Sequence, residues 1–171
     1  MKIVRSHSEE IARLYDSYGD MLFRLACSIL LNRADAEDAV QDMFIKIIGK
    51  VPEFDQERQE RAWLTRVLVN QCRDSLKRRK LRVYTPLDEL LETTGKEPSV
   101  PGPEEAEGSG VLQAVLSLGE KYREPILLYY FEGFSVEETA AILGIGQYAL
   151  KLRLARGREM LKKTNGGGRL T

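Results

Sequence analysis

The chain has 171 residues, 43% apolar and 30% charged, and its 26 basic side chains balance its 26 acidic ones. Its longest aromatic and aliphatic run, residues 126–131, falls far short of the roughly 20 residues that cross a bilayer, and no secretory signal is visible, so we expect a globular, cytoplasmic protein that is not inserted in a membrane. Cys27, Cys72 and the single histidine, His7, cannot supply the four ligands of a zinc site, so we expect neither a metal nor another cofactor.

The balanced charge is unevenly distributed along the chain. Residues 1–83 carry 16 basic and 13 acidic side chains, residues 84–110 one and seven, and residues 111–171 nine and six. This pattern predicts two mildly basic modules, 1–83 and 111–171, joined by a flexible acidic linker, 84–110. The linker is rich in proline, glycine and glutamate, and only residues 86–91 have the composition of a helical turn or two.

Two amphipathic helices open the first module. Apolar residues recur at three- and four-residue steps from Ile11 to Leu30, Tyr15 among them, and again from Ala36 to Ile48, with Asp35 placed to cap the second helix. The face of the second helix opposite its apolar stripe is acidic and polar, and consists of Glu37, Asp38, Gln41 and Asp42. Such a face is either solvent-exposed or docks on a basic protein surface, and spacing alone does not decide.

A third helix is predicted after a break at residues 51–55 and a polar loop at 56–61, and it ends in a basic cluster, residues 77–82. One polar stripe runs along it at intervals of four, three and four residues: Arg66, Asn70, Arg73 and Lys77. Asparagine offers both a donor and an acceptor, and the cations suit phosphates. The basic cluster either neutralises phosphates or complements the helix dipole. Trp63 either stacks on an unpaired base or belongs to the core.

The second module is predicted to begin with helix near Val111 and to continue from Tyr122 to Phe131. Residues 135–138, Ser-Val-Glu-Glu, fit a capping box that opens a short helix. A turn at residues 144–146 then leads into a helix from about Gln147 to Lys163, which buries Leu150, Leu154, Gly157 and Leu161. This is the outline of a helix-turn-helix.

The early turns of this last helix present the side chains that would enter a major groove or flank it. These are Gln147, Tyr148, Lys151, Leu152, Arg153 and Arg156. The alternative interpretation is an ordinary helical hairpin with a solvated basic face.

Both modules resemble one family. Residues 14–20, 35–44 and 62–66, with the basic cluster after Asp74, resemble region 2 of bacterial RNA polymerase sigma factors of the extracytoplasmic-function (ECF) type. Residues 118–135 and 143–158 resemble region 4 of the same family. The resemblance covers residues 10–83 and 111–163 in the family's order. It implies an all-α protein of two small helical domains that binds core RNA polymerase and directs it to a class of promoters.

The resemblance also implies roles for the residues. Five on the second helix would face the clamp helices of the large polymerase subunit: Asp35, Glu37, Asp38, Gln41 and Asp42. Those of the third helix would bind the minus-ten element as its strands separate, with Asn70 as the base contact: Trp63, Arg66, Asn70, Arg73, Lys77, Arg78 and Arg79. The loop at residues 53–60 lies where the family captures a flipped base, and the last helix would read the minus-thirty-five element as duplex.

The sequence departs from the family pattern at three positions, and it also allows a rival function. Gly119 stands where a proline is common, and Tyr148 and Leu152 replace small or polar residues. Leu152 would contact a thymine methyl group or belong to a surface that an anti-sigma partner covers. The rival is a free-standing helix-turn-helix regulator that binds duplex DNA without polymerase. No catalytic residues and no small-molecule substrate are expected, because no nucleophile-base set or phosphate-binding loop is legible.

Overall fold

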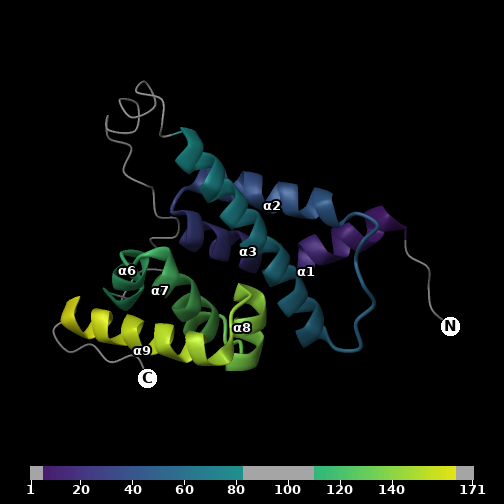
Figure 1. Ribbon diagram of the computed structural model, residues 1–171. Helices are drawn as coiled ribbons and strands as arrows, with labels where there is room; N and C mark the ends of the chain where they lie inside the picture. Colours follow the sequence, from purple (N-terminus) through teal and green to yellow (C-terminus); the bar gives the residue numbers. More distant parts are fainter. Residues whose placement is uncertain (1–5, 83–109, 165–171) are drawn as a thin grey trace. The chain divides into compact units, whose positions relative to one another are not determined.

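The computed structural model describes residues 6–82 and 110–164, and contacts divide the chain into two compact units, Met1–Ser99 and Val100–Thr171. Every regular element in the described ranges is helical (Figure 1). The prediction of an all-α chain with two helical domains is confirmed. The predicted turn at residues 86–91 and the rest of the linker lie outside the described residues. No helix of the described part is long and apolar enough to cross a membrane.

The first unit is a three-helix bundle of α1 (His7–Leu30), α2 (Arg33–Ile47) and α3 (Glu57–Arg82), in which each helix packs against the other two. The predicted apolar stripes form its core, since Leu14, Leu22, Met43, Leu64 and Leu68 are fully buried. Tyr15 is an exception, because it is 59% exposed, although its ring contacts that of Phe44 with centroids 5.5 Å apart. This core fixes which faces of α2 and α3 remain outside.

The prediction that Asp35 caps α2 is wrong. Leu31 adopts the left-handed conformation, φ 56°, and its N–H bonds back to the Cys27 carbonyl, which ends α1. The single residue left before α2 is Asn32, and its side-chain oxygen accepts the Asp35 N–H at 2.9 Å. Asp35 therefore lies in the first turn of α2, where its carboxylate is available to another partner.

Helix α3 begins earlier than predicted, so the polar loop is shorter. Residues 57–61 are helical, and the N–H groups of Gln59 and Glu60 bond to the Gln56 carbonyl. The acidic Glu57 and Glu60 suit the positive end of a helix dipole. The loop that was expected at 53–60 thus ends at residue 56, and the basic cluster lies inside α3.

The second unit comprises α6 (Gly110–Leu116), α7 (Glu120–Ile126), the π-helix η1 (Leu127–Phe131), α8 (Val136–Leu143) and α9 (Gln147–Thr164). The segment predicted as one helix over 122–131 starts at Glu120 and widens into η1 after Pro125. Arg123 is buried at its start, where it donates to the Leu118 carbonyl at 2.7 Å. Burial lowers the pKa of this guanidinium.

The helix-turn-helix is present as predicted. Ser135 and Glu138 form the capping box of α8, Gly144 ends it with φ 68°, and α9 starts at Gln147. The buried residues of α9 are the four expected: Leu150, Leu154, Gly157 and Leu161. Gly157 lets α7 and α9 approach closely, because a Cβ there would lie 2.5 Å from the Ile126 Cδ1 atom of α7 and the isoleucine side chain would have to shift.

Candidate functional site

The five side chains assigned to polymerase contact lie on one side of α2. Glu37, Asp38 and Gln41 are exposed, and Asp35 and Asp42 are half-buried. Glu37 lies 3.6 Å from Arg33 within the same helix, and both side chains are more than half exposed. This acidic face of α2, defined by the five residues, is thus accessible to a partner. Its edge meets α3.

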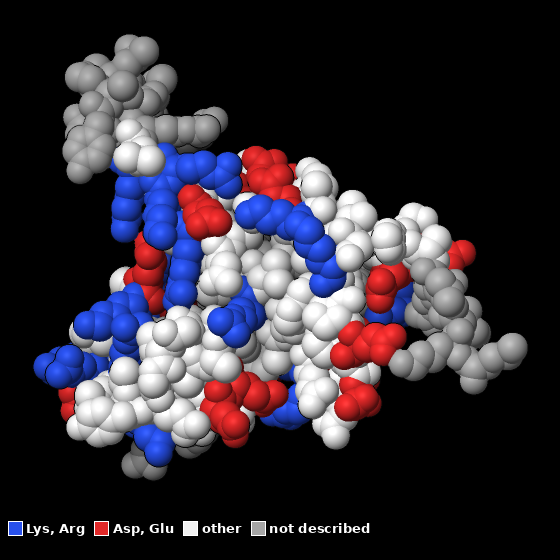
Figure 2. All heavy atoms as spheres, turned by 45° about the vertical axis from the view of Figure 1, so that its right-hand side comes forward, with Lys and Arg blue, Asp and Glu red and all other residues white. Residues whose placement is uncertain are grey.

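The acidic face of α2 and the basic end of α3 share a groove. Arg79 pairs with the Asp35 carboxylate and donates to the Leu30 carbonyl at 3.3 Å. A cavity of about 320 Å³ separates the two helices there, and its lining consists of Asp35, Asp38, Asp42, Ser75, Arg78 and Arg79. Two sets of residues that the sequence assigned to different partners are therefore neighbours. In Figure 2, basic side chains gather at the end of α3 with acidic ones directly beside them.

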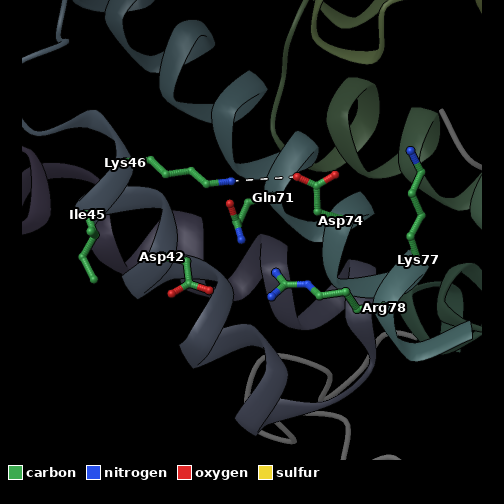
Figure 3. A pocket seen from close by; sticks show the side chains of 7 residues that line it. All are labelled: Asp42, Ile45, Lys46, Gln71, Asp74, Lys77 and Arg78. Carbon is green, nitrogen blue, oxygen red and sulfur yellow. Dashed lines mark ion pairs between the residues drawn. The ribbon is translucent and has the colours of Figure 1, made fainter. Parts of the chain in front are cut away.

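Further along the same pair of helices lies a second cavity, of about 600 Å³. Lys46 of α2 and Asp74 of α3 lie 3.9 Å apart across it, and Gln71 lies between the helices (Figure 3). Gln71 is 2% exposed, and its Oε1 atom has no hydrogen-bond partner. Arg78 reaches from α3 toward α2 and Asp42. Lys77 also lines this cavity, with its amine pointing away from Asp42.

The polar stripe of α3 lies on a different side of that helix, and only its last residue, Lys77, also lines the second cavity. Arg66, Asn70 and Lys77 are exposed, and Arg73 is half-exposed, at the spacing the sequence predicted. They form one accessible row along the helix, which suits an extended anionic strand. Arg78 and Arg79, which follow Lys77 by about 100° and 200° around the helix, do not belong to this row.

Trp63 is half-exposed near the start of α3 and packs against Phe54 of the preceding loop, with ring centroids 5.8 Å apart. The sequence alternatives for Trp63 were a stacking surface and a core residue, and the structure places it between the two. Phe54 was not predicted to contribute. Its place in the short break between α2 and α3 was the available signal, since an aromatic residue in a polar loop needs a packing partner.

A polar cluster fixes the first turn of α3 to α1. Glu60 accepts two bonds from Arg13, at 3.0 and 2.8 Å, and one from the Tyr18 hydroxyl at 3.0 Å. Burial, with the hydrogen bond to Glu60, raises the pKa of Tyr18 to about 12. The bond to Glu60 raises the pKa of Arg13. This cluster therefore fixes the first turn of α3 against α1, one turn before Trp63.

The outward face of α9 carries the side chains predicted to read DNA. Gln147, Lys151 and Arg156 are exposed and Arg153 is half-exposed. Two large apolar side chains stand among them, Tyr148 at 77% and Leu152 at 41% exposure. Arg158 is turned inward and donates to the Tyr130 hydroxyl at 2.9 Å, so it ties α9 to η1. The six predicted residues share the first three turns of a helix supported by the α7 and α8 core.

Comparison with known proteins defines the class of this fold. The family model for Sigma-70 region 2 matches residues 14–82, and that for Sigma-70, region 4 matches residues 110–161. The chain is 32% identical to ECF RNA polymerase sigma factor SigW of Bacillus subtilis (strain 168), over 95% of this chain and 92% of SigW. SigM of Mycobacterium tuberculosis (strain H37Rv) is 27% identical over 90% of this chain and 76% of its own.

Two solved structures share the fold. Sigma factor RpoE of Bartonella quintana, crystallised with the anti-sigma factor NepR, has a TM-score of 0.76 and 25% identity, with 94% of this chain and 99% of that chain covered. CnrH in complex with the cytosolic domain of CnrY has a TM-score of 0.62 and 27% identity, with 92% and 88% covered. The chain belongs to the ECF RNA polymerase sigma factors of the sigma-70 family.

Proposed function

We propose that this chain binds core RNA polymerase through the acidic face of α2 and directs it to promoters whose two elements are read by α3 and α9. The observation that carries the proposal is that one chain holds both surfaces, the polar stripe of α3 and the outward face of α9, in units that match sigma regions 2 and 4. Residues 1–83 and 111–171 would be the two functional domains, with 84–110 as the linker. The chain itself would catalyse no reaction.

Each predicted residue then has a physical task. The carboxylates of Asp35, Glu37, Asp38 and Asp42 would attract a basic polymerase surface, and Gln41 would add hydrogen bonds. Asn70 would contact a base of the melted minus-ten strand, while Arg66, Arg73 and Lys77 neutralise phosphates. Trp63 and Phe54 would offer ring faces to an unpaired base at the end of the row.

The α9 face would read the minus-thirty-five duplex in the major groove. Arginine and glutamine side chains suit base edges there, and Lys151 suits the backbone. Leu152→Ser tests whether the exposed leucine reads a thymine methyl group. We expect promoter fragments selected by the variant to differ from those of the parent at one position, and unchanged selection would leave Leu152 to a protein partner.

Regulation by an anti-sigma factor is part of the proposal, because the relative RpoE was crystallised with an anti-sigma factor. Such a partner would hold the chain inactive, in the cytoplasm or at the membrane to which it is attached, until a signal releases it. Exposed Tyr148 and Leu152 give it apolar area to cover.

Run-off transcription with bacterial core polymerase, with and without this protein, on a library of promoter fragments tests the proposal. We expect initiation that depends on the protein and selects fragments with two conserved elements. No initiation together with tight duplex binding by the protein alone would favour the rival regulator, which needs neither the acidic face of α2 nor the polar stripe of α3.

A further inference from the structure

The seven residues assigned to minus-ten DNA are divided between two sides of α3. Arg66, Asn70 and Lys77 lie exposed along the polar stripe. Arg78 and Arg79 instead line the groove against α2, and Figure 3 shows the Arg78 guanidinium turned toward Asp42. The two arginines therefore face carboxylates of their own chain. A DNA strand would instead lie along the polar stripe, on the side of α3 that faces away from this groove.

Arg79 is held by two elements at once. It pairs with Asp35 in the first turn of α2 and donates to the Leu30 carbonyl at the end of α1, at 3.3 Å. Arg78 lines both cavities together with Asp42, and Asp38 completes the acidic wall of the smaller one. Among the described residues of the groove, three carboxylates of α2 thus oppose two guanidinium groups of α3.

The ion pair between Arg79 and Asp35 can be replaced by pairs with external charges. The Arg79 and Asp35 side chains are 35% and 40% exposed, so water screens their attraction and an external charge can reach either one. The same carboxylates belong to the acidic face of α2. A basic partner surface that binds Asp35 would remove the counter-charge of Arg79.

We propose that in the free protein Asp35 of α2 holds Arg79 of α3 in an internal pairing, and that binding of a basic protein surface to α2 releases Arg79 for promoter phosphates. The inference rests on the proposed function, since it makes the polymerase surface and the DNA surface communicate through one groove. Polymerase binding would then raise the affinity of α3 for DNA, and the isolated protein would bind DNA weakly.

A double-mutant cycle on the full-length free protein tests this pairing. The probe is a fluorescein-labelled single-stranded DNA of mixed sequence, titrated at several KCl concentrations. We expect Asp35→Asn to raise affinity about threefold, the size of one half-exposed ion pair, and to steepen the salt dependence by about one released counterion. Arg79→Ala is expected to change little alone and to abolish the gain in the Asp35→Asn background. Asp35→Ser with Arg79→Ala repeats the cycle if Asp35→Asn lowers the folding yield.

Two matched controls separate the possible outcomes. Glu37→Gln also removes one negative charge from α2, but Glu37 does not pair with a residue of α3. Only the part of the affinity gain by which Asp35→Asn exceeds Glu37→Gln is therefore attributed to release of Arg79. Lys77→Ala on the polar stripe is expected to weaken binding of the free protein. If Lys77→Ala weakens binding but neither aspartate variant strengthens it beyond Glu37→Gln, the internal pairing is refuted and the proposed function stands. If Lys77→Ala has no effect either, α3 is not the DNA surface and the proposed function itself fails at this site.

The same variants in the polymerase complex complete the test. On a promoter fragment selected by run-off transcription, Arg79→Ala is expected to lower the affinity of the polymerase complex while leaving that of the free protein unchanged. A merely structural role for Arg79 would lower both affinities alike, and that result would overturn the inference.

Discussion

At the scale of single residues, the cluster around Glu60 ties the first turn of α3 to α1. Its carboxylate receives three hydrogen bonds, and its side chain is only 13% exposed. Glu60→Gln would remove the negative charge that pairs with Arg13. It would also replace one accepting oxygen by an NH2 group, which faces a donor instead of accepting from it. We expect a loss of about 1–3 kcal/mol in the free energy of unfolding, measured by urea denaturation. Glu37→Gln is the control, because its pair is exposed and is expected to cost below about 0.5 kcal/mol.

The hydroxyl of Tyr18 gives the same cluster a pH dependence. Its pKa in the folded protein is about 12, above the usual 10, so folding favours the protonated form. The stabilisation is therefore complete below about pH 10 and is lost as the pH rises toward 12. Tyr18→Phe removes this titration. We expect its unfolding free energy to fall less steeply than that of the parent between pH 10 and 12, and parallel curves would contradict the assignment.

These residue contacts mark what a sequence alone does not give. Arg13 and Glu60 are 47 positions apart, and Asp35 and Arg79 are 44 apart, so no local pattern joins them. A periodic pattern gives the angle of each side chain around its own helix, but not the rotation of one helix against another. The acidic face of α2 and the basic end of α3 could therefore both be predicted, whereas the contact between them, at Asp35 and Arg79, could not.

At the scale of helices, prediction succeeded where the apolar period was strong. The four buried residues of α9 and the capping box of α8 were predicted from the sequence. Buried residues recur at helical intervals, and the two residues of a capping box lie three positions apart. The start of α3 was missed because its first turn is polar and carries no apolar period. The cap of α2 was missed because both Asn32 and Asp35 are good capping residues, and only the left-handed Leu31 decides between them.

The crossing of α7 and α9 depends on one glycine. A Cβ at Gly157 would meet the Ile126 Cδ1 atom at 2.5 Å in a fully buried contact. We expect Gly157→Ala to destabilise the second unit by about 1–3 kcal/mol, since overpacking outweighs the gain in helix propensity. Ile126→Val removes the clashing atom, so the double variant should lose less than the two single losses combined. The Ile126→Val background is also the control, and a Gly157→Ala loss that is equal with valine and with isoleucine at position 126 would refute the packing argument.

At the scale of the whole molecule, the two DNA surfaces that we propose on α3 and α9 predict additive behaviour. Lys77 on α3 and Lys151 on α9 are both exposed, and each would neutralise about one phosphate on its own promoter element. In the polymerase complex on a selected promoter, each lysine-to-alanine variant should weaken binding and reduce the salt slope by about one counterion. Because the two lysines belong to different units and would bind different promoter elements, the double variant should show the sum of both changes in log affinity and in slope. A double variant no weaker than either single one would mean that α3 and α9 do not bind the same promoter together. Carrying both units on one chain would then add nothing to the affinity. If both bind together, binding of one promoter element makes binding of the other intramolecular and raises its effective concentration.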